Sequence, residues 1–270
     1  KGKAVGYALL MLYCFCAFVF LFYTSFSQLA AAFFPLGLGW LYFAMFAIMA
    51  FALMFIGSVF TAKSQLFEAK DNELLLSMPV KPGMILLSRM AALLVMNFVF
   101  ELVVALPVFA AWLQYGGVSG AGVLAFLVIV LALPLFSLAV SCLFAWLISL
   151  ITSHMRNTTV VTMVLSVVFL LAYFVFCARM NAYVTQLAAN GQAIAGALRA
   201  ALPLVWLGQA AADGNFANLG LTLLWTVLPF VLAYALLARS FVRIVTTHRG
   251  QIHVKYEKKA MHASSQAAAL

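Results

Sequence analysis

The stretch that decides the fold is residues 123–151, VLAFLVIVLALPLFSLAVSCLFAWLISLI, which contains no charged side chain. At about 1.5 Å per residue, an α-helix of this length can cross the ~30 Å hydrocarbon layer of a bilayer. The rest of the chain has the same character, because 67% of its residues are hydrophobic and 8% are charged. A soluble domain is only about 45–50% apolar. The sequence therefore predicts a membrane protein and excludes a soluble domain.

Working outward from this stretch, five more apolar stretches of membrane-crossing length are separated by short polar connections. The six expected spans are residues 5–26, 38–62, 85–113, 123–151, 158–177 and 219–238. We expect an all-α fold in which residues 1–240 form a polytopic bundle of six transmembrane helices. The remaining residues, 241–270, are basic and are expected to be a cytoplasmic tail or a linker to a second six-helix half.

The distribution of basic residues predicts the orientation of the bundle. With both termini on one side, 13 of the 15 lysines and arginines fall on that side, and only Arg179 and Arg199 fall on the other. Such a bias in segments flanking the spans sets orientation during insertion. We therefore expect a multi-pass protein of the cell membrane with both termini in the cytoplasm. The basic residues do not form a groove with interleaved aromatic residues, which argues against nucleic acid as a partner.

The connection between the second and third expected spans, residues 67–79, reads FEAKDNELLLSMP and holds three of the six acidic residues of the chain. Good helix formers dominate it, and a helical wheel places Phe67, Leu74, Leu75 and Met78 toward one side. Pro79 then ends the predicted helix. Two interpretations are open: a connection lying on the membrane surface, or an element that docks into a groove on a soluble partner.

The run 67–89, FEAKDNELLLSMPVKPGMILLSR, resembles the segment between the second and third helices of ABC exporter permeases of the type-2 class. In that family a "K-D-x-E-L-L-L-x-x-P-V" stretch forms the coupling helix that contacts the ATP-binding subunit. The resemblance extends to the six-span layout. The counterparts of this motif here are Lys70, Asp71, Glu73, Leu74, Leu75, Leu76, Pro79 and Val80. Taken with the apolar side of the predicted helix, the resemblance leads us to expect contact with the ATP-binding subunit through Phe67, Lys70, Asp71, Glu73, Leu74, Leu75, Met78 and Pro79.

The resemblance implies a permease component of an ATP-driven exporter rather than an enzyme. The sequence has no G-x-x-x-x-G-K-[ST] loop, so ATP is expected on a partner subunit and no cofactor is expected in this chain. The other expected partners are membrane lipid and a second six-helix unit, either a second copy or a second half of the same chain. The histidines and serines show no spacing typical of a catalytic or metal site.

Glu101 is the one acidic residue well inside an apolar stretch, and Asn97 precedes it by one helical turn on the same face. A carboxyl group at that depth is costly unless it is protonated, paired or facing water. It could join helices within the bundle, or it could handle a substrate or a proton. A secondary transporter that uses Glu101 is therefore the first alternative function, and a membrane scaffold or assembly protein is the second.

Overall fold

The structure is a computed structural model that describes residues 2–66, 82–153 and 158–247. Within these residues every regular element is an α-helix, as the sequence predicts. The described helices are α1 (Gly2–Phe33), α2 (Gly39–Leu66), α4 (Pro82–Tyr115), α5 (Gly120–Ser153), α6 (Thr158–Ala189), α7 (Gly191–Leu198), α8 (Leu202–Asp213) and α9 (Phe216–Thr247).

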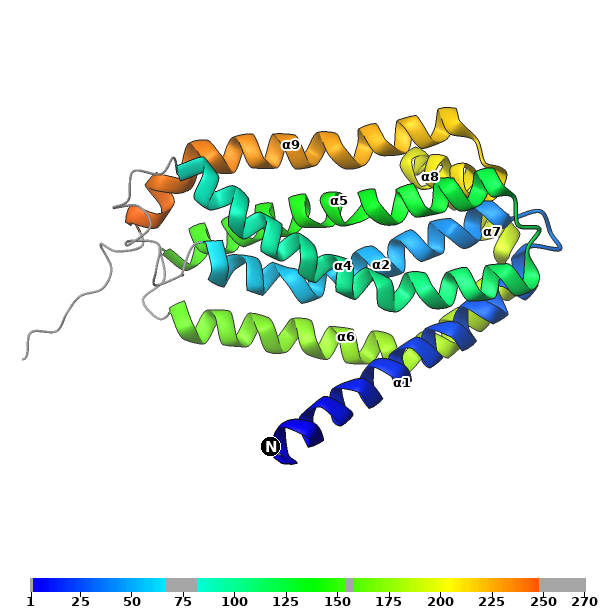
Figure 1. Cartoon of the computed structure of the whole chain (residues 1–270), viewed down its shortest axis with the longest axis horizontal. Coiled ribbons are helices and arrows are strands. Elements are labelled where there is room, and N and C mark those ends of the chain that lie inside the picture. The colour runs from blue at the N-terminus through cyan, green and yellow to red at the C-terminus, as the bar shows by residue number, and fades with distance from the viewer. Residues whose placement is uncertain (1, 67–81, 154–157, 248–270) are drawn as a thin grey trace, which may run out of the picture.

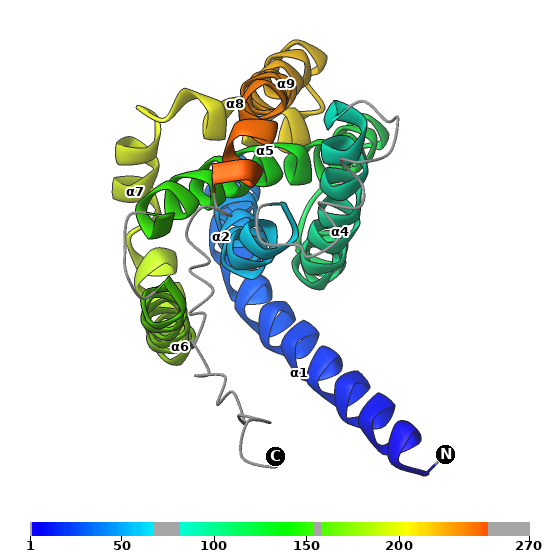
Figure 2. The same cartoon turned by 90° about the vertical axis from the view of Figure 1, so that its left-hand side faces the viewer.

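The long helices run side by side, with α2 near the centre of the bundle (Figures 1 and 2). Helix α2 packs against α4, α5 and α8, and α9 packs against α5 and α8. Helix α1 crosses α4 and also contacts α6, while its N-terminal half projects away from the other helices. The short helices α7 and α8 lie at the end of the bundle where the loops α1–α2 and α4–α5 also lie (Figure 1). We call this the capped end.

Short polar residues and glycine define the helix boundaries at the capped end. The Ser119 hydroxyl accepts a hydrogen bond from the Gly122 amide (3.0 Å), and the Asn215 side chain accepts one from the Ala217 amide (3.0 Å). Both are N-cap interactions, which satisfy amides that the first helical turn leaves without a partner. Helix α8 ends at Gly214, whose φ of 67° is a left-handed conformation that favours glycine.

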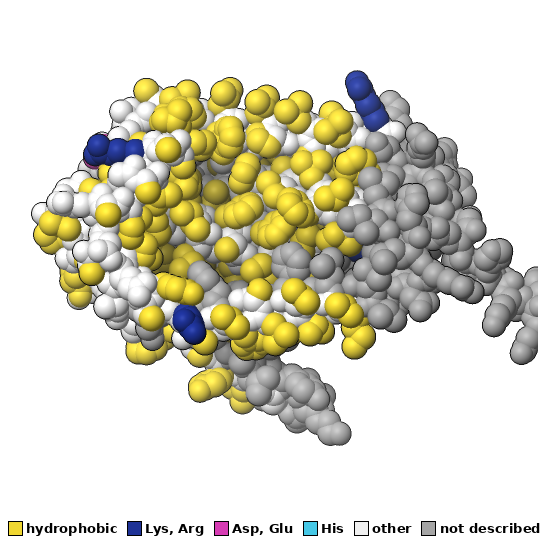
Figure 3. Space-filling view, turned by 180° about the vertical axis from the view of Figure 1, so that it is seen from behind, with side chains coloured by type: hydrophobic (Ala, Val, Ile, Leu, Met, Phe, Trp, Pro, Cys, Tyr) yellow, Lys and Arg dark blue, Asp and Glu magenta, His cyan; other side chains and the backbone are white. Residues whose placement is uncertain are grey.

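Five described helices are long and apolar enough to cross a membrane, and they coincide with five of the expected spans. These segments are Phe15–Phe33, Gly39–Leu66, Gly83–Tyr115, Gly120–Ser149 and Phe216–Arg239. The expected fifth span, residues 158–177, is helical within α6. Its status as a membrane span, and with it the count of six, stays a prediction. Hydrophobic side chains cover the visible face of the described bundle, and lysine and arginine are sparse on it (Figure 3).

Helix α1 continues to Phe33, past the end of the first span expected at residue 26, and two later boundaries also differ from the sequence-based expectation. Helix α9 continues to Thr247, past the end of the sixth span expected at residue 238. Helix α6 continues to Ala189, so the connection before α9 is shorter than expected and contains α7 and α8. In both cases alanine, valine and other helix-compatible residues continue beyond the apolar core of the span, and a helix ends at a breaker or a cap rather than at the edge of hydrophobicity.

The buried core consists of two clusters at different depths. The larger lies toward the capped end and contains a group of aromatic side chains, Phe43, Phe46, Phe109, Trp112 and Phe126, which we call the aromatic cluster. The smaller lies at the opposite end, where α2 ends and α4 begins. This anchor cluster comprises Ala62, Leu66, Ile85, Leu86, Met90, Leu93, Leu138, Cys142, Ala145 and Leu237.

Candidate functional site

The anchor cluster joins four helices directly beside the predicted coupling segment. Leu66, the last residue of α2, and Leu86, in the first turns of α4, are both fully buried in it. Side chains of α5 and α9 complete the cluster. Because interiors are close-packed, a displacement of either helix end is transmitted to the neighbouring helices. The two ends that flank residues 67–81 are therefore fixed in the bundle.

A polar contact reinforces the same place. The Arg89 guanidinium donates a hydrogen bond from Nη1 to the Gln65 carbonyl oxygen (2.6 Å), which ties α4 to the last turn of α2. Lys63 is almost completely buried in that turn. A cation near the C-terminus of a helix interacts favourably with its dipole, so Lys63 and Arg89 both suit the end of α2.

The residues predicted to contact an ATP-binding subunit lie outside the described residues, and the coupling helix stays a prediction. These residues are Phe67, Lys70, Asp71, Glu73, Leu74, Leu75, Met78 and Pro79. The basic segment 248–270, expected to be a tail or linker, also lies outside them.

Asn97 and Glu101 lie together on the buried face of α4, where the sequence predicted that they share a face. Neither side chain is exposed, and none of their four polar side-chain atoms has a hydrogen-bond partner. They lie between the two apolar clusters, since Leu93 belongs to the anchor cluster and Val104 to the larger one. Glu101 is thus enclosed within the bundle rather than exposed to the groove described next.

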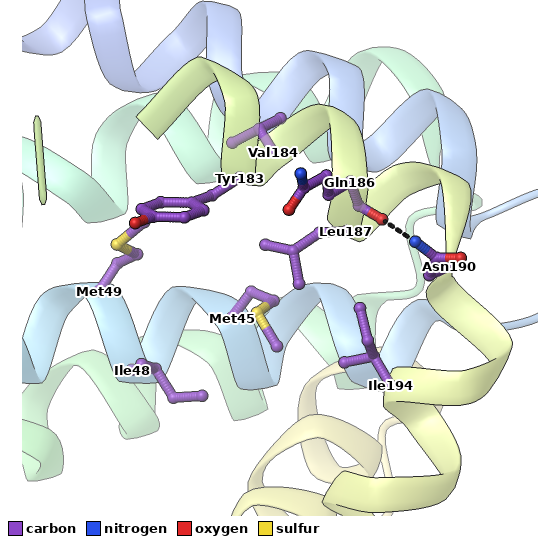
Figure 4. A pocket seen from close by; sticks show the side chains of 9 residues that line it. All are labelled: Met45, Ile48, Met49, Tyr183, Val184, Gln186, Leu187, Asn190 and Ile194. Atoms are coloured by element: carbon purple, nitrogen blue, oxygen red, sulfur yellow. Dashed lines mark hydrogen bonds between the residues drawn. The ribbon is translucent and has the colours of Figure 1, made fainter. Parts of the chain in front are cut away.

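Two adjoining hollows follow α2 toward the capped end. The first, of about 440 Å³, lies between α2 and the α6–α7 corner (Figure 4). Met45 and Met49 of α2 face Tyr183 and Leu187 of α6 across it. The Asn190 side chain donates a hydrogen bond to the Gln186 carbonyl oxygen (3.1 Å) at its edge.

The second hollow, of about 470 Å³, lies between α2, α5, α8 and α9. Phe51, Phe136 and Trp225 supply most of its aromatic wall, and Thr222 and Thr226 add hydroxyl groups. These two hydroxyls are bonded within α9, to the carbonyl oxygens of Asn218 (2.8 Å) and Thr222 (3.0 Å). Ile48 lines both hollows, so the two are neighbours along α2, and we call them together the groove.

The groove can accommodate apolar molecules, but its lining suggests no chemistry. Across the described ranges, no three side chains among His, Cys, Asp and Glu are grouped so that they could hold a metal ion. Methionine and aromatic side chains provide an adaptable, weakly polar surface of the kind found at promiscuous binding sites. The groove was not predicted from the sequence, because an apolar wall facing a groove has the same residue types as one facing lipid.

The fold and these features define a polytopic α-helical membrane protein. More specifically, the chain belongs to a family described as "Membrane protein of 12 TMs", whose sequence model matches residues 7–270. No curated protein and no solved structure matches the chain.

Proposed function

We propose that this protein is the permease component of an ATP-binding-cassette exporter. A separate subunit would bind and hydrolyse ATP, and the predicted helix at residues 67–78 would dock into it. Closure of ATP-bound subunits would push this helix, and the membrane helices would reorient around a pathway shared with a second six-helix unit.

The observation that carries the proposal is the anchor cluster. A coupling segment acts as a lever only if its two ends are held by the helices that must move. Leu66 and Leu86 place those ends in one buried cluster with α5 and α9, and the hydrogen bond from Arg89 to Gln65 closes the base of the segment. A flexible membrane-surface connection would not need such an attachment.

Two further features support the proposal. The two hollows of the groove along α2 are lined mainly by apolar side chains, as expected of one wall of a pathway completed by another unit. The family description counts twelve transmembrane segments, and the sequence predicts six in these residues. Twelve helices correspond to two such units, so the second unit would be another copy or a second half of the same chain.

The coupling surface is tested by replacing Leu74 and Leu75 with alanine. Loss of two apolar anchors should remove about 1–3 kcal/mol of docking free energy, because a few buried side chains dominate most interfaces. The variant should reach the membrane in normal amount, and less ATPase activity should copurify with it. The control is Leu127→Ala with Leu131→Ala, which changes two exposed leucines of α5. Equal ATPase recovery from both variants would contradict the proposal.

The second candidate function, an ion- or proton-coupled secondary transporter, is favoured by the enclosed Glu101 carboxyl group. Glu101→Gln keeps the shape of the side chain and removes its titration. In proteoliposomes carrying a pH-sensitive dye, the exporter proposal expects no difference in proton leak between wild type and variant. Proton movement in the wild type that Glu101→Gln abolishes would favour the secondary transporter instead. For the third alternative, a membrane scaffold, the described residues offer no specific observation.

A further inference from the structure

Three polar side chains lie at mid-depth of the bundle without any hydrogen-bond partner. Asn97 and Glu101 come from α4 and Ser137 comes from α5, and each has an exposed fraction of 0%. The five atoms concerned are the amide oxygen and nitrogen of Asn97, both carboxyl oxygens of Glu101 and the hydroxyl oxygen of Ser137. Buried polar groups in folded proteins are nearly always paired with protein or ordered water.

The register between α4 and α5 places these side chains at the same depth. Trp112 of α4 packs against Phe126 of α5, with ring centroids 6.0 Å apart. Glu101 precedes Trp112 by 11 residues, and Ser137 follows Phe126 by 11 residues. Since the two helices are antiparallel neighbours with the same rise per residue, Glu101 and Ser137 come to the same level.

Asn97 lies one helical turn before Glu101, on the side of the anchor cluster. We call Asn97, Glu101 and Ser137 the polar layer. At the corresponding level of α5, the hydroxyls of Ser58 and Ser141 are hydrogen-bonded to each other (2.7 Å). This pair is satisfied and joins α2 to α5. Counted along the helices, the three unpaired side chains therefore come within about one helical turn of the level of this polar contact, with apolar clusters on both sides.

One of two prolines adds an acceptor close to the polar layer. Pro107 of α4 and Pro134 of α5 lie inside their helices and lack the amide hydrogen that would bond to the carbonyl four residues earlier. The carbonyl groups affected are those of Val103 and Val130, whose side chains belong to the buried cluster. Val103 lies two residues from Glu101, so the α4 acceptor is near the polar layer, whereas Val130 lies seven residues, about 10 Å, from Ser137 and is outside it.

The mixture of hydrogen-bond donors and acceptors in these side chains indicates which kind of ligand they can bind. The Asn97 amide nitrogen can only donate, whereas the amide, hydroxyl and carbonyl oxygens accept. A metal cation would bind the oxygens and leave the Asn97 nitrogen without a partner. An apolar ligand would satisfy none of the groups. Water donates and accepts, and buried waters typically make about three hydrogen bonds each to such groups.

We propose that Asn97, Glu101 and Ser137 form an internal water site that joins α4 to α5 at mid-depth of the bundle. The site is separate from the apolar groove along α2, since none of the three residues lines either hollow. It does not depend on the proposed exporter function.

The test measures water access through thiol reactivity. Ser137→Cys places a thiol in the site with little change in size, and native Cys142, which is fully buried in the anchor cluster on the same helix, is the matched dry control. Cys14, Cys16 and Cys177 are first replaced by alanine. The probe is methyl methanethiosulfonate, which is small and neutral, and labelling at each position is read by peptide mass spectrometry.

The thiolate is the reactive form of cysteine and needs water to stabilise its charge. The Ser137→Cys thiol should therefore react at least ~10 times faster than Cys142, since a site with bound water supports the ionised form. Adding Asn97→Leu and Glu101→Leu removes two partners of the water. The labelling rate of the Ser137→Cys thiol should then fall to that of Cys142. Adding Glu101→Gln should preserve the fast reaction.

Two results would overturn the water site. One is a Ser137→Cys thiol as slow as Cys142 in a protein that elutes normally on gel filtration. The other is a fast reaction that persists after both leucine substitutions, because the water would then be held by other groups. If Ser137→Cys does not fold, Asn97→Cys provides a second reporter from α4 with the same expected contrast.

Discussion

Helices α8 and α6 are joined through α7, yet they pack in opposite ways. Helix α8 packs closely on α2, α5 and α9. A Cβ atom added at Gly208 would meet the Trp40 carbonyl oxygen of α2. Helix α6 contacts α1 and, to a lesser extent, α5. Among its described side chains between residues 163 and 183, none is buried.

The comparison shows that hydrophobicity alone does not decide which helix of this bundle is buried against other helices. Lipid tails are as apolar as leucine, so a side chain gains little transfer free energy by leaving lipid for another helix. Close approach and dispersion contacts decide instead, and these come from small residues and fitted rings. Helix α8 has the small residues at its contact with α2, whereas the exposed part of α6 carries branched side chains such as Val167, Val168 and Leu171.

The largest effect is expected from a substitution in the closely packed region. Phe126 is 3% exposed and contacts the rings of Phe43, Phe46, Phe109 and Trp112. Phe126→Ala should lower the free energy of unfolding by about 3 kcal/mol, since a cavity remains where the ring made its contacts. Thermal unfolding of the detergent-solubilised protein measures this loss. A variant as stable as the wild type would show that the rings do not hold α2, α4 and α5 together.

An intermediate effect is expected at the contact between α8 and α2. Gly208→Ala forces a methyl group against the Trp40 backbone and should cost about 1–3 kcal/mol, as overpacking does in a rigid core. The matched control is Gly196→Ala in α7, where the added Cβ meets nothing within 4 Å. This control should be neutral or stabilise the protein by about 0.5–1 kcal/mol, because glycine is a poor helix former. Equal changes in melting temperature would mean that α8 is not packed as closely as described.

The same physics explains what could be predicted from the sequence. The all-α fold followed from long uncharged stretches, of which residues 123–151 are the most extreme, because only a helix satisfies its own backbone in lipid. The shared face of Asn97 and Glu101 followed from helical spacing. Helices α7 and α8 lie between the fifth and sixth expected spans, and their positions could not be predicted because their bounds depend on caps such as Gly214.

The groove and the water site could not be predicted in this way. To predict the groove, one would have to know that Ile48 of α2 lines two hollows at once. When every side of a helix is apolar, the hydrophobic pattern does not show which side chains face a hollow. Ser137 resembles the other serines inside the spans, such as Ser141, and only the register between α4 and α5 brings it to the level of Glu101. One signal was present: two prolines and a carboxyl group in the middle of neighbouring spans.

The smallest effect is expected from a substitution on the exposed side of α6. Leu171 is 58% exposed, so Leu171→Ala removes few contacts within the described bundle. The free energy of unfolding should change by less than about 0.5 kcal/mol, as for surface substitutions elsewhere. If a second six-helix unit covers α6, the same substitution should instead weaken association, which cross-linking in the membrane and gel filtration in detergent would both detect. The contrary result is a Leu171→Ala variant that lowers the free energy of unfolding as much as Phe126→Ala does, with association unchanged. That result would mean that α6 is buried within its own unit and that the contrast with α8 is wrong.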